Sequence, residues 1–365
     1  MASPALHLWL RAETKPLEHR CALTPTHARE LLARGFKITV EEDPLRIFAI
    51  DEFVSAGCTI APAHAWTSSA PTDAIILGLK ELTPTDAFAL SHTHIHFAHC
   101  YKRQAGWTHT LDRFKRGGGA LLDLEFLVDD LGRRVAAFGY MAGFAGAAIG
   151  LDVWCESSDQ ARTNFPQVEP FPNEDALIAH IKSRLAARGS IPRVLVMGAL
   201  GRCGRGAVAM LRAAGIPESH LAQWDMAETK AGGPFPAIAT DYDVFVNCIY
   251  LSSPIPPFLT MAEIARADRK LAVMVDVSCD PTNPLNPVPV YTESTTFAKP
   301  TLRVADGFHV VGIDHLPSLL PRESSDMFVQ DLLPSLLALD AGLTHPVWKR
   351  AVDLFKAKVA EMDKE

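Results

Sequence analysis

Apolar and polar positions in the first 137 residues follow two alternating patterns. Short apolar runs rich in β-branched residues predict buried strands, and stretches with apolar residues three or four positions apart predict helices. Strand and helix alternate throughout, and this order argues for a parallel sheet covered by helices. We expect strands at 5–9, 36–40, 73–79, 94–97 and 120–124, and helices at about 24–35, 51–56 and 106–116.

A second alternation of the same kind follows the stretch from Val135 to Leu151. These 17 residues carry no charge, which places them at the short limit for a membrane-spanning helix. Because four of them are glycines, we interpret the stretch as a helix packed tightly inside the protein. Beyond it we expect helices at 174–188 and 207–214, strands at 194–197, 243–247, 271–277 and 308–313, an apolar run that ends at Asp225, and a proline-rich loop at 280–289.

From about Ser324 onward the pattern is only helical, with helices expected at 326–339, kinked at Pro334, and at 346–362. Nothing remains there to add to a sheet, so we expect these helices to pack back on the first domain. The predicted fold is α/β, with two Rossmann-like domains built on parallel sheets. Residues 1–137 and 326–365 would form a substrate-side domain, and residues 138–325 a dinucleotide-binding domain.

The composition is that of a globular protein, since 48% of the 365 residues are hydrophobic and 21% are charged. The net charge of −7 and the dispersed lysines and arginines provide no basic face, so we expect no nucleic-acid partner. The seven cysteines form no C-x-x-C pair, and charged residues follow soon after the N-terminus. We therefore expect a reduced, cytoplasmic monomer that acts on a small molecule and has no membrane partner.

A glycine cluster provides the first chemical signal. Gly198, Gly201, Gly204 and Gly206 lie between an apolar strand and a helix. Such a turn lets the backbone approach a pyrophosphate, and the helix N-terminus directs N–H groups at its charge. Asp225 follows about 20 residues on, where an acid can accept hydrogen bonds from an adenosine ribose and repel a 2′-phosphate. The spacing G-x-x-G-x-x-G departs from G-x-G-x-x-G, and a plain tight turn is the alternative, but the whole pattern favours NAD over NADP.

A histidine-rich run provides the second signal. If residues 91–102 contain a strand, then His92, His94 and His96 share one face and His99 lies on the other. Alternating histidines can hold a metal, so a metal hydrolase is an alternative from a different class of enzyme. No Asp- or Glu-containing ligand motif accompanies them, and we expect no metal. The other interpretation of His92 and His94 is that they are polar loop residues.

Three further side chains lie at the carboxyl ends of predicted strands, where α/β proteins place their functional groups: Lys80, His99 and Glu125. A lysine that directly follows a buried strand can be partly desolvated, which lowers its pKa toward use as a base. The negative charge of the neighbouring Glu81 would raise the pKa of this lysine. A solvated lysine is the alternative for Lys80.

Six stretches closely resemble the NAD-dependent, lysine-forming saccharopine dehydrogenases of the fungal α-aminoadipate pathway. The resemblance implies a two-domain relative of alanine dehydrogenase, with the active site in the cleft between the domains. It also implies the oxidative cleavage of saccharopine with NAD and water to lysine, 2-oxoglutarate and NADH. The stretches are 10–20 (LRAETKPLEHR), 78–81 (GLKE), 97–102 (FAHCYK), 123–127 (DLEFL), 132–139 (GRRVAAFG) and 314–321 (DHLPSLLP).

The resemblance also assigns roles to single residues. It implies that Lys80 and His99 are catalytic, that Glu81 and Glu125 tune them, and that Arg20 and Arg134 each bind a substrate carboxylate, although a surface ion pair is the alternative for both arginines. The chain ends in Met-Asp-Lys-Glu and lacks the peroxisomal tripeptide of some family members. We expect the cofactor NAD to be held by Gly201, Arg202, Cys203, Gly204, Asp225, Thr229 and Asp314.

Two cysteines form a candidate disulfide. Cys203 lies in the glycine turn, and Cys248 ends a strand that we expect beside the first strand of the dinucleotide unit. Neighbouring strands lie about 4.8 Å apart, within the range that a disulfide can bridge. The family's motifs place cysteines at both positions. Two buried thiols that never pair are the alternative.

Two other functions stay open from the residues alone. An alanine-dehydrogenase-like enzyme would release ammonia from a small amino acid, but the paired Arg20 and Arg134 suggest a substrate with several carboxylates. A catalytically idle NAD-binding sensor is disfavoured, because Lys80, His99 and Glu125 occur together.

Overall fold

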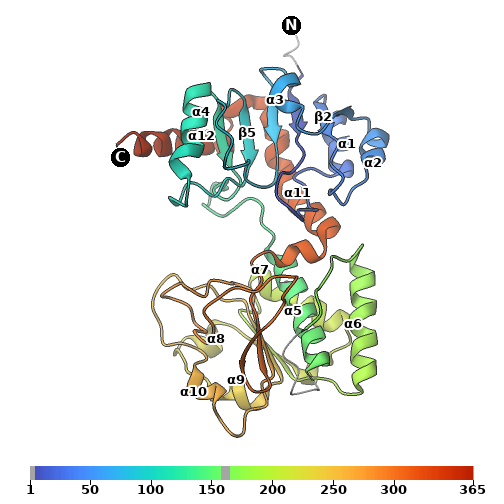
Figure 1. The fold of residues 1–365 in the computed structure, drawn as a ribbon, viewed down its shortest axis with the longest axis vertical. Coiled ribbons are helices and arrows are strands. Elements are labelled where there is room, and N and C mark those ends of the chain that lie inside the picture. The colour runs from blue at the N-terminus through green and yellow to red at the C-terminus, as the bar shows by residue number, and fades with distance from the viewer. Residues whose placement is uncertain (1–4, 158–164, 365) are drawn as a thin grey trace. The chain divides into compact units, whose positions relative to one another are not determined.

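The computed structural model describes residues 5–157 and 165–364, which divide into two compact units (Figure 1). Unit 1 contains Met1–Ala137 and Ser324–Glu365, and unit 2 contains Phe138–Glu323. Each unit is built on one six-stranded sheet, so the α/β class and the two parallel-sheet domains expected from the sequence are confirmed.

Unit 1 holds a fully parallel sheet in the order β3-β2-β1-β4-β5-β6, which is the strand order of a Rossmann domain. The order places β1 between β2 and β4, so the chain segments that follow β1 and β4 leave the sheet side by side at the same edge. The strands are β1 (His7–Leu10), β2 (Lys37–Glu41), β3 (Thr59–Ala61), β4 (Ile75–Leu77), β5 (Thr93–His96) and β6 (Ala120–Asp123).

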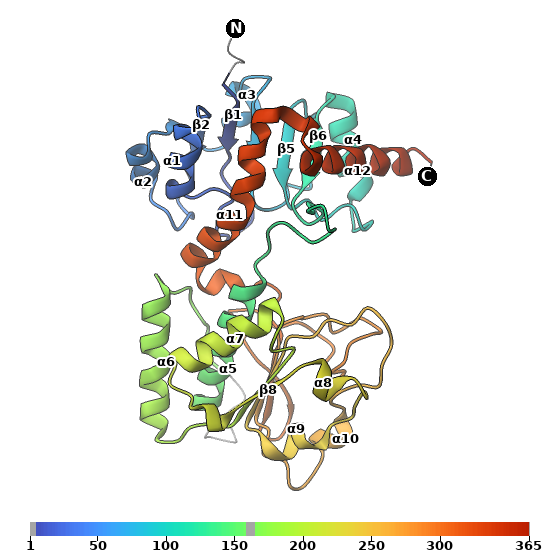
Figure 2. The same ribbon diagram turned by 180° about the vertical axis from the view of Figure 1, so that it is seen from behind.

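Helices cover this sheet, and the two C-terminal helices return to it as expected. Helix α11 continues through Pro334 to Leu337, and Phe328 from this helix is fully buried against Phe97, with ring centroids 5.8 Å apart (Figure 2). Helix α12 packs against β6 and α4. The helices are α1 (Pro25–Ala33), α2 (Ile50–Ala56), α3 (Trp66–Ser69), α4 (Trp107–Gly117), α11 (Pro321–Leu337), the 3-10 helix η3 (Ala338–Thr344) and α12 (Pro346–Met362).

Unit 2 holds the second sheet, in the order β11-β12-β10-β9-β7-β8, in which only the edge strand β11 is antiparallel. The strand β7, which lies between β9 and β8, alternates between two cores: Val194 and Val196 face the core under α5, α6 and α7, and Leu195 and Met197 face the opposite core. The strands are β7 (Val194–Met197), β8 (Leu221–Trp224), β9 (Val244–Asn247), β10 (Val273–Asp276), β11 (Leu302–Ala305) and β12 (Phe308–Val311).

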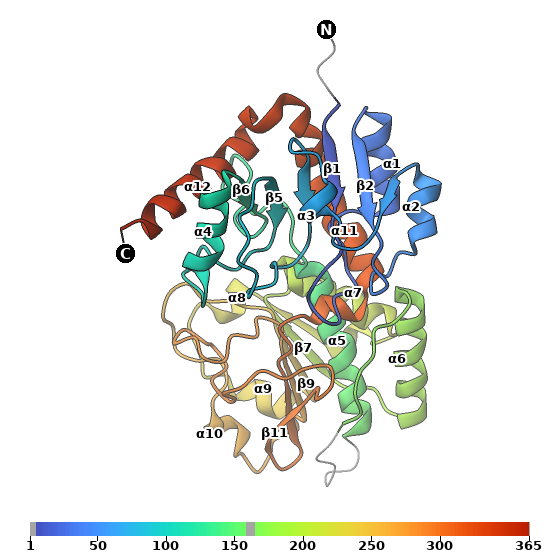
Figure 3. The same cartoon turned by 45° about the horizontal axis from the view of Figure 1, so that its top comes forward.

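The helices of unit 2 lie on both faces of its sheet, with α5 to α7 on one side and the short α9 and α10 on the other (Figure 3). Helix α6 begins after Asn173, whose side chain accepts a hydrogen bond from the N–H of Ala176, and ends at Gly189 in the left-handed conformation. The elements are α5 (Gly139–Glu156), α6 (Glu174–Arg188), α7 (Arg202–Ala213), η1 (Glu218–His220), α8 (Met226–Thr229), α9 (Pro236–Asp241), α10 (Met261–Ile264) and η2 (Leu316–Leu319).

The glycine-rich helix α5 crosses α7 with the two backbones in contact. A Cβ atom on Gly143 would lie 1.8 Å from the carbonyl oxygen of Cys203, and one on Gly206 would lie 1.9 Å from the carbonyl oxygen of Tyr140. Only glycine allows this approach. The interpretation of this stretch as a tightly packed internal helix is confirmed, and no helix in the described part of the chain is long and apolar enough to cross a membrane.

The structure also differs from the expected elements at a few places. The sequence pattern missed β3, α3, β11 and the short helices of unit 2. Helix α11 begins at Pro321, five residues before the expected start at Asp326, because a proline is well tolerated in the first turn of a helix.

Candidate functional site

Lys80 lies three residues beyond the end of β4, at the carboxyl edge of the sheet of unit 1. The carboxylate of Glu13 accepts hydrogen bonds from the N–H groups of Leu79, at 2.7 Å, and Lys80, at 2.9 Å. The side chain of Lys80 is half-buried, and this burial lowers its pKa, with the charge of Arg20 acting in the same direction. Glu18 and Glu81 partly oppose the shift. The environment therefore favours a neutral amine more than water does.

His99 follows β5 and pairs with the residue next to Lys80. Its Nδ1 lies 3.2 Å from one carboxylate oxygen of Glu81, and the Nζ of Lys15 lies 2.9 Å from the other. Burial acts to raise the pKa of Glu81, but the contacts from His99, its own backbone and Lys15 outweigh burial and hold that pKa below its usual value. Glu81 is therefore an anion that connects His99 to Lys15.

The backbone of His99 has a φ of 49°, in the left-handed region. This conformation is uncommon for a residue other than glycine, and it directs the chain sharply away from the strand. The ring stacks on Phe97 at a centroid distance of 6.4 Å. His99 is thus held by a ring contact with Phe97 and by the contact of its Nδ1 with the carboxylate of Glu81.

Glu125 follows β6 and is surrounded by basic groups. The Nζ of Lys102 lies 2.6 Å from its carboxylate, and the guanidinium of Arg134 lies 3.7 Å from it. Arg134 also donates a hydrogen bond from Nε to the carbonyl oxygen of Glu125, at 3.1 Å. Arg134 is partly exposed and close to an acid, so its geometry is compatible both with a substrate-binding role and with the alternative of an ion pair.

Asp123 connects the ends of β5 and β6. Its carboxylate accepts hydrogen bonds from the N–H groups of Ala98, at 3.3 Å, and Glu125, at 2.8 Å. Burial raises the pKa of Asp123 to about 6, although both hydrogen bonds act in the opposite direction. One buried carboxyl group therefore holds the N–H of Ala98, the residue before His99, and the N–H of Glu125 itself.

Arg20 is buried, which corrects the interpretation of this residue as part of a surface ion pair. Its guanidinium makes a two-pronged contact with Glu18, with Nε at 2.8 Å and Nη2 at 2.7 Å from the two carboxylate oxygens, and both side chains are at most 4% exposed. The charge of Arg20 holds the pKa of Glu18 low, against the effect of burial. A buried charge pair of this kind is costly to desolvate, so it is more than a chance surface contact.

Five residues around the site were not identified from the sequence. Glu18, Lys15 and Lys102 lie inside the stretches 10–20 and 97–102 that carry the family resemblance, and their spacing next to Arg20 and His99 was the available signal. Glu13 and Asp123 lie inside the stretches 10–20 and 123–127, but spacing could not reveal their bonds to Leu79 and Lys80 and to Ala98, which join segments distant in sequence.

In unit 2 the glycine turn lies directly after β7. Gly198 has a φ of 81°, Gly201 precedes the first residue of α7, and a Cβ on Gly204 would lie 2.1 Å from the carbonyl oxygen of Gly198. The first N–H groups of α7 have no acceptor within the helix. A turn with glycines at 198 and 201, at the positive end of a twelve-residue helix, fits a pyrophosphate.

Asp225 lies at the end of β8 and contacts this turn. One carboxylate oxygen accepts a hydrogen bond from the N–H of Leu200, and the other accepts one from the N–H of Met226, both at 2.9 Å. Thr229 is buried and donates its hydroxyl to the carbonyl oxygen of Asp225, at 2.8 Å, whereas Asp314 is exposed in the turn after β12. Asp225 is therefore fixed beside the glycine turn, and the hydroxyl of Thr229 is used within α8.

Cys248 directly follows β9, as expected, whereas Cys203 lies in the first turn of α7, beyond the glycine turn that follows the neighbouring strand β7. The strand β9 pairs with β7, and the N–H of Cys248 donates to the carbonyl oxygen of Met197, at 2.9 Å. Both cysteines are free thiols in the structure, and burial raises the pKa of each. The charge of a Cys203 thiolate would raise the pKa of Cys248 further. Their pairing stays a prediction.

His94 and His96 lie on β5 with their rings 5.9 Å apart, and His92 lies in the bend directly before the strand, with its ring 6.4 Å from that of His94. His94 is fully buried, and its ring makes edge contacts with Trp66 and Phe114, at centroid distances of 5.0 and 5.2 Å. Burial holds the pKa values of His94 and His96 well below the usual range. The interpretation of His94 as a polar loop residue is wrong. In the part of the chain that the structure describes, no three His, Cys, Asp or Glu side chains are grouped to hold a metal.

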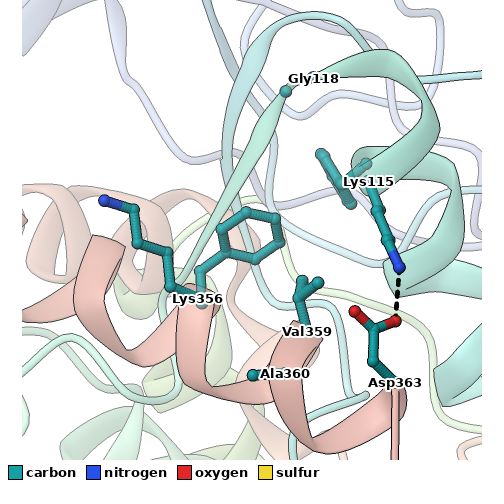
Figure 4. A pocket seen from close by; sticks show the side chains of 9 residues that line it. Lys115, Gly118, Lys356, Val359, Ala360 and Asp363 are labelled. Carbon is teal, nitrogen blue, oxygen red and sulfur yellow. Dashed lines mark hydrogen bonds and ion pairs between the residues drawn. The ribbon is translucent and has the colours of Figure 1, made fainter.

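A groove of about 280 Å³ lies on unit 1 between α4 and α12 (Figure 4). Phe114, Phe355 and Val359 form its apolar lining, and an ion pair of 2.6 Å between Lys115 and Asp363 lies at its edge. None of the predicted site residues lines this groove.

Two domain models match the chain. The alanine dehydrogenase/PNT N-terminal domain matches residues 9–145, and the alanine dehydrogenase/PNT C-terminal domain matches residues 222–361. The structure of an L-alanine dehydrogenase superposes with a TM-score of 0.66 over 96% of this chain and 94% of that chain, at 15% sequence identity. Fold and domains place the chain in the alanine dehydrogenase/PNT class of two-domain proteins.

Relatives at much higher identity narrow this class. The NAD(+), L-lysine-forming saccharopine dehydrogenases of Neurospora crassa and Yarrowia lipolytica are each 56% identical to the chain. They cover 99% and 98% of it, over 98% and 99% of their own lengths. The corresponding protein of Schizosaccharomyces pombe is 52% identical over 98% of the chain and 100% of its own length. The chain belongs to the NAD(+), L-lysine-forming saccharopine dehydrogenase family, as its motifs predicted.

Proposed function

We propose that the chain catalyses the oxidative cleavage of saccharopine with NAD and water to L-lysine, 2-oxoglutarate and NADH. The observation that carries this proposal within the site is the contact between His99 and Glu81, which brings an imidazole to the residue next to a half-buried lysine. Relatives named for this activity, 56% identical over nearly the whole chain, support it.

The reaction requires two proton-transfer steps on the substrate. The secondary amine must lose a proton before its neighbouring C–H bond can give up hydride, and the resulting imine must then be hydrated and its carbinolamine cleaved. Lys80, whose pKa is lowered by burial, would accept the amine proton. His99, paired with Glu81, would then move protons to and from the attacking water and the carbinolamine. Bound NAD supplies the hydride acceptor.

Arginines would bind the carboxylates of saccharopine. Arg20 is fixed by Glu18, and this contact would keep its guanidinium oriented for a planar carboxylate of the substrate. Arg134 would exchange part of its contact with Glu125 for a substrate carboxylate. A substrate with three carboxylates fits two such arginines better than the single carboxylate of alanine does.

Unit 2 would be the dinucleotide-binding domain and unit 1 the substrate-side domain. The N-terminus of α7, with Gly201, Arg202, Cys203 and Gly204, would hold the pyrophosphate. Asp225 would accept hydrogen bonds from the adenosine ribose, because each of its oxygens, although bonded to one N–H group, keeps a further lone pair. We also propose that Thr229 and Asp314 border the cofactor.

The seven cysteines, all of which the structure describes, are free thiols, and this fits a monomeric enzyme of the reducing cytoplasm. Size-exclusion chromatography with light scattering tests the oligomeric state.

The activity is tested by following NADH oxidation with lysine plus 2-oxoglutarate and, in parallel, with ammonia plus pyruvate. We expect oxidation only with the first pair. Turnover with ammonia and pyruvate alone would instead establish the alanine-dehydrogenase-like alternative.

A further inference from the structure

Two buried side chains hold the backbone that carries Lys80. Glu13 accepts the N–H groups of Leu79 and Lys80 with its two carboxylate oxygens, at 2.7 and 2.9 Å. Arg11 donates from Nη2 to the carbonyl oxygen of Lys80. Arg11 and Glu13 are joined in turn, with 3.4 Å between Nη1 and a carboxylate oxygen. The peptide groups on both sides of Lys80 are thus fixed by one ion pair.

The end of β4 creates the need for this pair. At the strand end, Arg11 N–H bonds the Leu77 carbonyl oxygen and Gly78 N–H bonds the Ile95 carbonyl oxygen, each at 3.0 Å, and the Leu79 carbonyl oxygen accepts from Phe97 N–H at 2.9 Å. The N–H groups of Leu79 and Lys80 do not pair with a neighbouring strand. A buried N–H group without an acceptor is costly. Glu13, which is 8% exposed, satisfies both.

Gly78 makes room for Arg11. A Cβ atom at position 78 would lie 2.3 Å from the Nε of Arg11 and 2.6 Å from its Cζ, so any larger residue would displace the guanidinium. Arg11 is 1% exposed and has little space to move elsewhere. The glycine is therefore explained by the close approach of Arg11 to the strand end.

We propose that Glu13, supported by Arg11, is a positioning residue that fixes the backbone of the catalytic Lys80. Glu13 acts through Lys80, because both of its carboxylate oxygens are directed at main-chain N–H groups. This inference rests on the proposed function, since it takes Lys80 as the group that accepts the amine proton. A displacement of about 1 Å at a reacting group can cost about 10²-fold in rate.

The first test is the variant Glu13→Ala, with Glu13→Gln as a milder change that keeps one acceptor oxygen. We expect turnover to fall by about 10- to 100-fold for Glu13→Ala and by less for Glu13→Gln, with NADH affinity unchanged in a fluorescence titration. The pH profile of oxidative cleavage gives a second readout. Because burial lowers the pKa of Lys80, a lysine released toward solvent regains a higher pKa, so the rise in activity should move to higher pH.

A double-mutant cycle with Lys80→Met separates positioning from general stability. If Glu13 acts through Lys80, Glu13→Ala should cost less than about threefold in the Lys80→Met background. Glu263→Ala is the matched control, because Glu263 is also 8% exposed and also accepts two hydrogen bonds, from Thr260, but lies in unit 2. Its effect should be equal in both backgrounds. If Glu13→Ala does not fold, the cycle is run with Glu13→Gln.

Equal losses from the Glu13 variant in both backgrounds, or wild-type turnover and pH profile in the folded variant, would overturn the inference. Wild-type turnover in Lys80→Met would instead overturn the assignment of Lys80, and with it this inference. Absence of activity with lysine plus 2-oxoglutarate in the unaltered enzyme would count against the proposed function itself.

Discussion

The Nδ1 atom of His99 lies 3.2 Å from the carboxylate of Glu81, the residue that follows Lys80 in the chain. The carboxylate of Glu81 therefore contacts His99 directly and affects Lys80 through its charge. Glu81 raises the pKa of Lys80, against the larger lowering effect of burial.

Replacing Glu81 by Gln should shift the pH dependence of the enzyme. Without the negative charge, the ammonium form of Lys80 loses stabilisation, and its pKa falls further below the ordinary value of lysine. A neutral base is then available at lower pH, so the rise in the rate of oxidative cleavage should move to lower pH. Initial rates measured across the pH range check this expectation, and a shift to higher pH would contradict the arrangement.

Lys80→Met and His99→Gln should each lower turnover by about 10²- to 10⁴-fold, which is the usual effect of losing a positioned acid or base. NADH binding should change little, because neither residue belongs to the glycine turn of unit 2. Steady-state kinetics and NADH fluorescence measure the two effects. Normal turnover in either variant would remove that residue from the catalytic role.

Asp225→Ala should narrow the preference for NAD over NADP. The carboxylate is fixed by the N–H groups of Leu200 and Met226, so its charge would face the 2′-position of a bound adenosine ribose. The ratio of kcat/KM for the two cofactors measures the preference. Equal use of both cofactors by the unaltered enzyme would show that Asp225 does not discriminate.

Oxidation should be able to join Cys203, in the first turn of α7, and Cys248, which directly follows β9, the strand beside β7. A bridge would stiffen the glycine turn and change NAD affinity. Thiol counting on unfolded protein prepared without reductant, followed by peptide mapping, tests the pairing, with Cys203→Ser as the control. If the two cysteines never occur in one disulfide-linked fragment, the pair is only part of the core.

Asp123 should make the free energy of unfolding of the enzyme decrease as the pH rises from about 4 to about 6. Burial raises its pKa from 3.8 to about 6, so the native state binds more protons than the unfolded state in this window. The free energy of unfolding should therefore decrease as the pH rises, by about 3 kcal/mol for this group.

Urea unfolding of Asp123→Asn at several pH values checks this expectation, since the variant should lose that decrease. Asp129→Asn is the control, because Asp129 also accepts two backbone N–H groups but is more exposed. The same pH dependence in both variants would contradict the role of Asp123.

Most of the fold was predictable because its strands are buried on both faces. The strands β4, β7, β9 and β10 read as continuous apolar runs, whereas the missed edge strands β3 and β11 are short and largely half-exposed. Their pairing is imposed by the neighbouring strand, and their own residues carry little signal.

The candidate site was predictable only in part, for a related reason. Lys80, His99 and Glu125 could be located because each follows a predicted strand. The end of a strand can be recognised from its own local sequence. The role of Glu13 depends on β1 lying beside β4, a long-range pairing that spacing does not reveal. Arg20 was found as a site residue, but its burial with Glu18 could not be read from the sequence.

The contact between α5 and α7 has a consequence for cofactor exchange. At Gly143 and Gly206 main chain lies against main chain, so no side chain at these two positions can change rotamer and alter the contact between the helices. The N-terminal part of α7 is then held firmly against α5. A dinucleotide that arrives or leaves would meet N–H groups already in place, so little conformational entropy would be lost at each exchange.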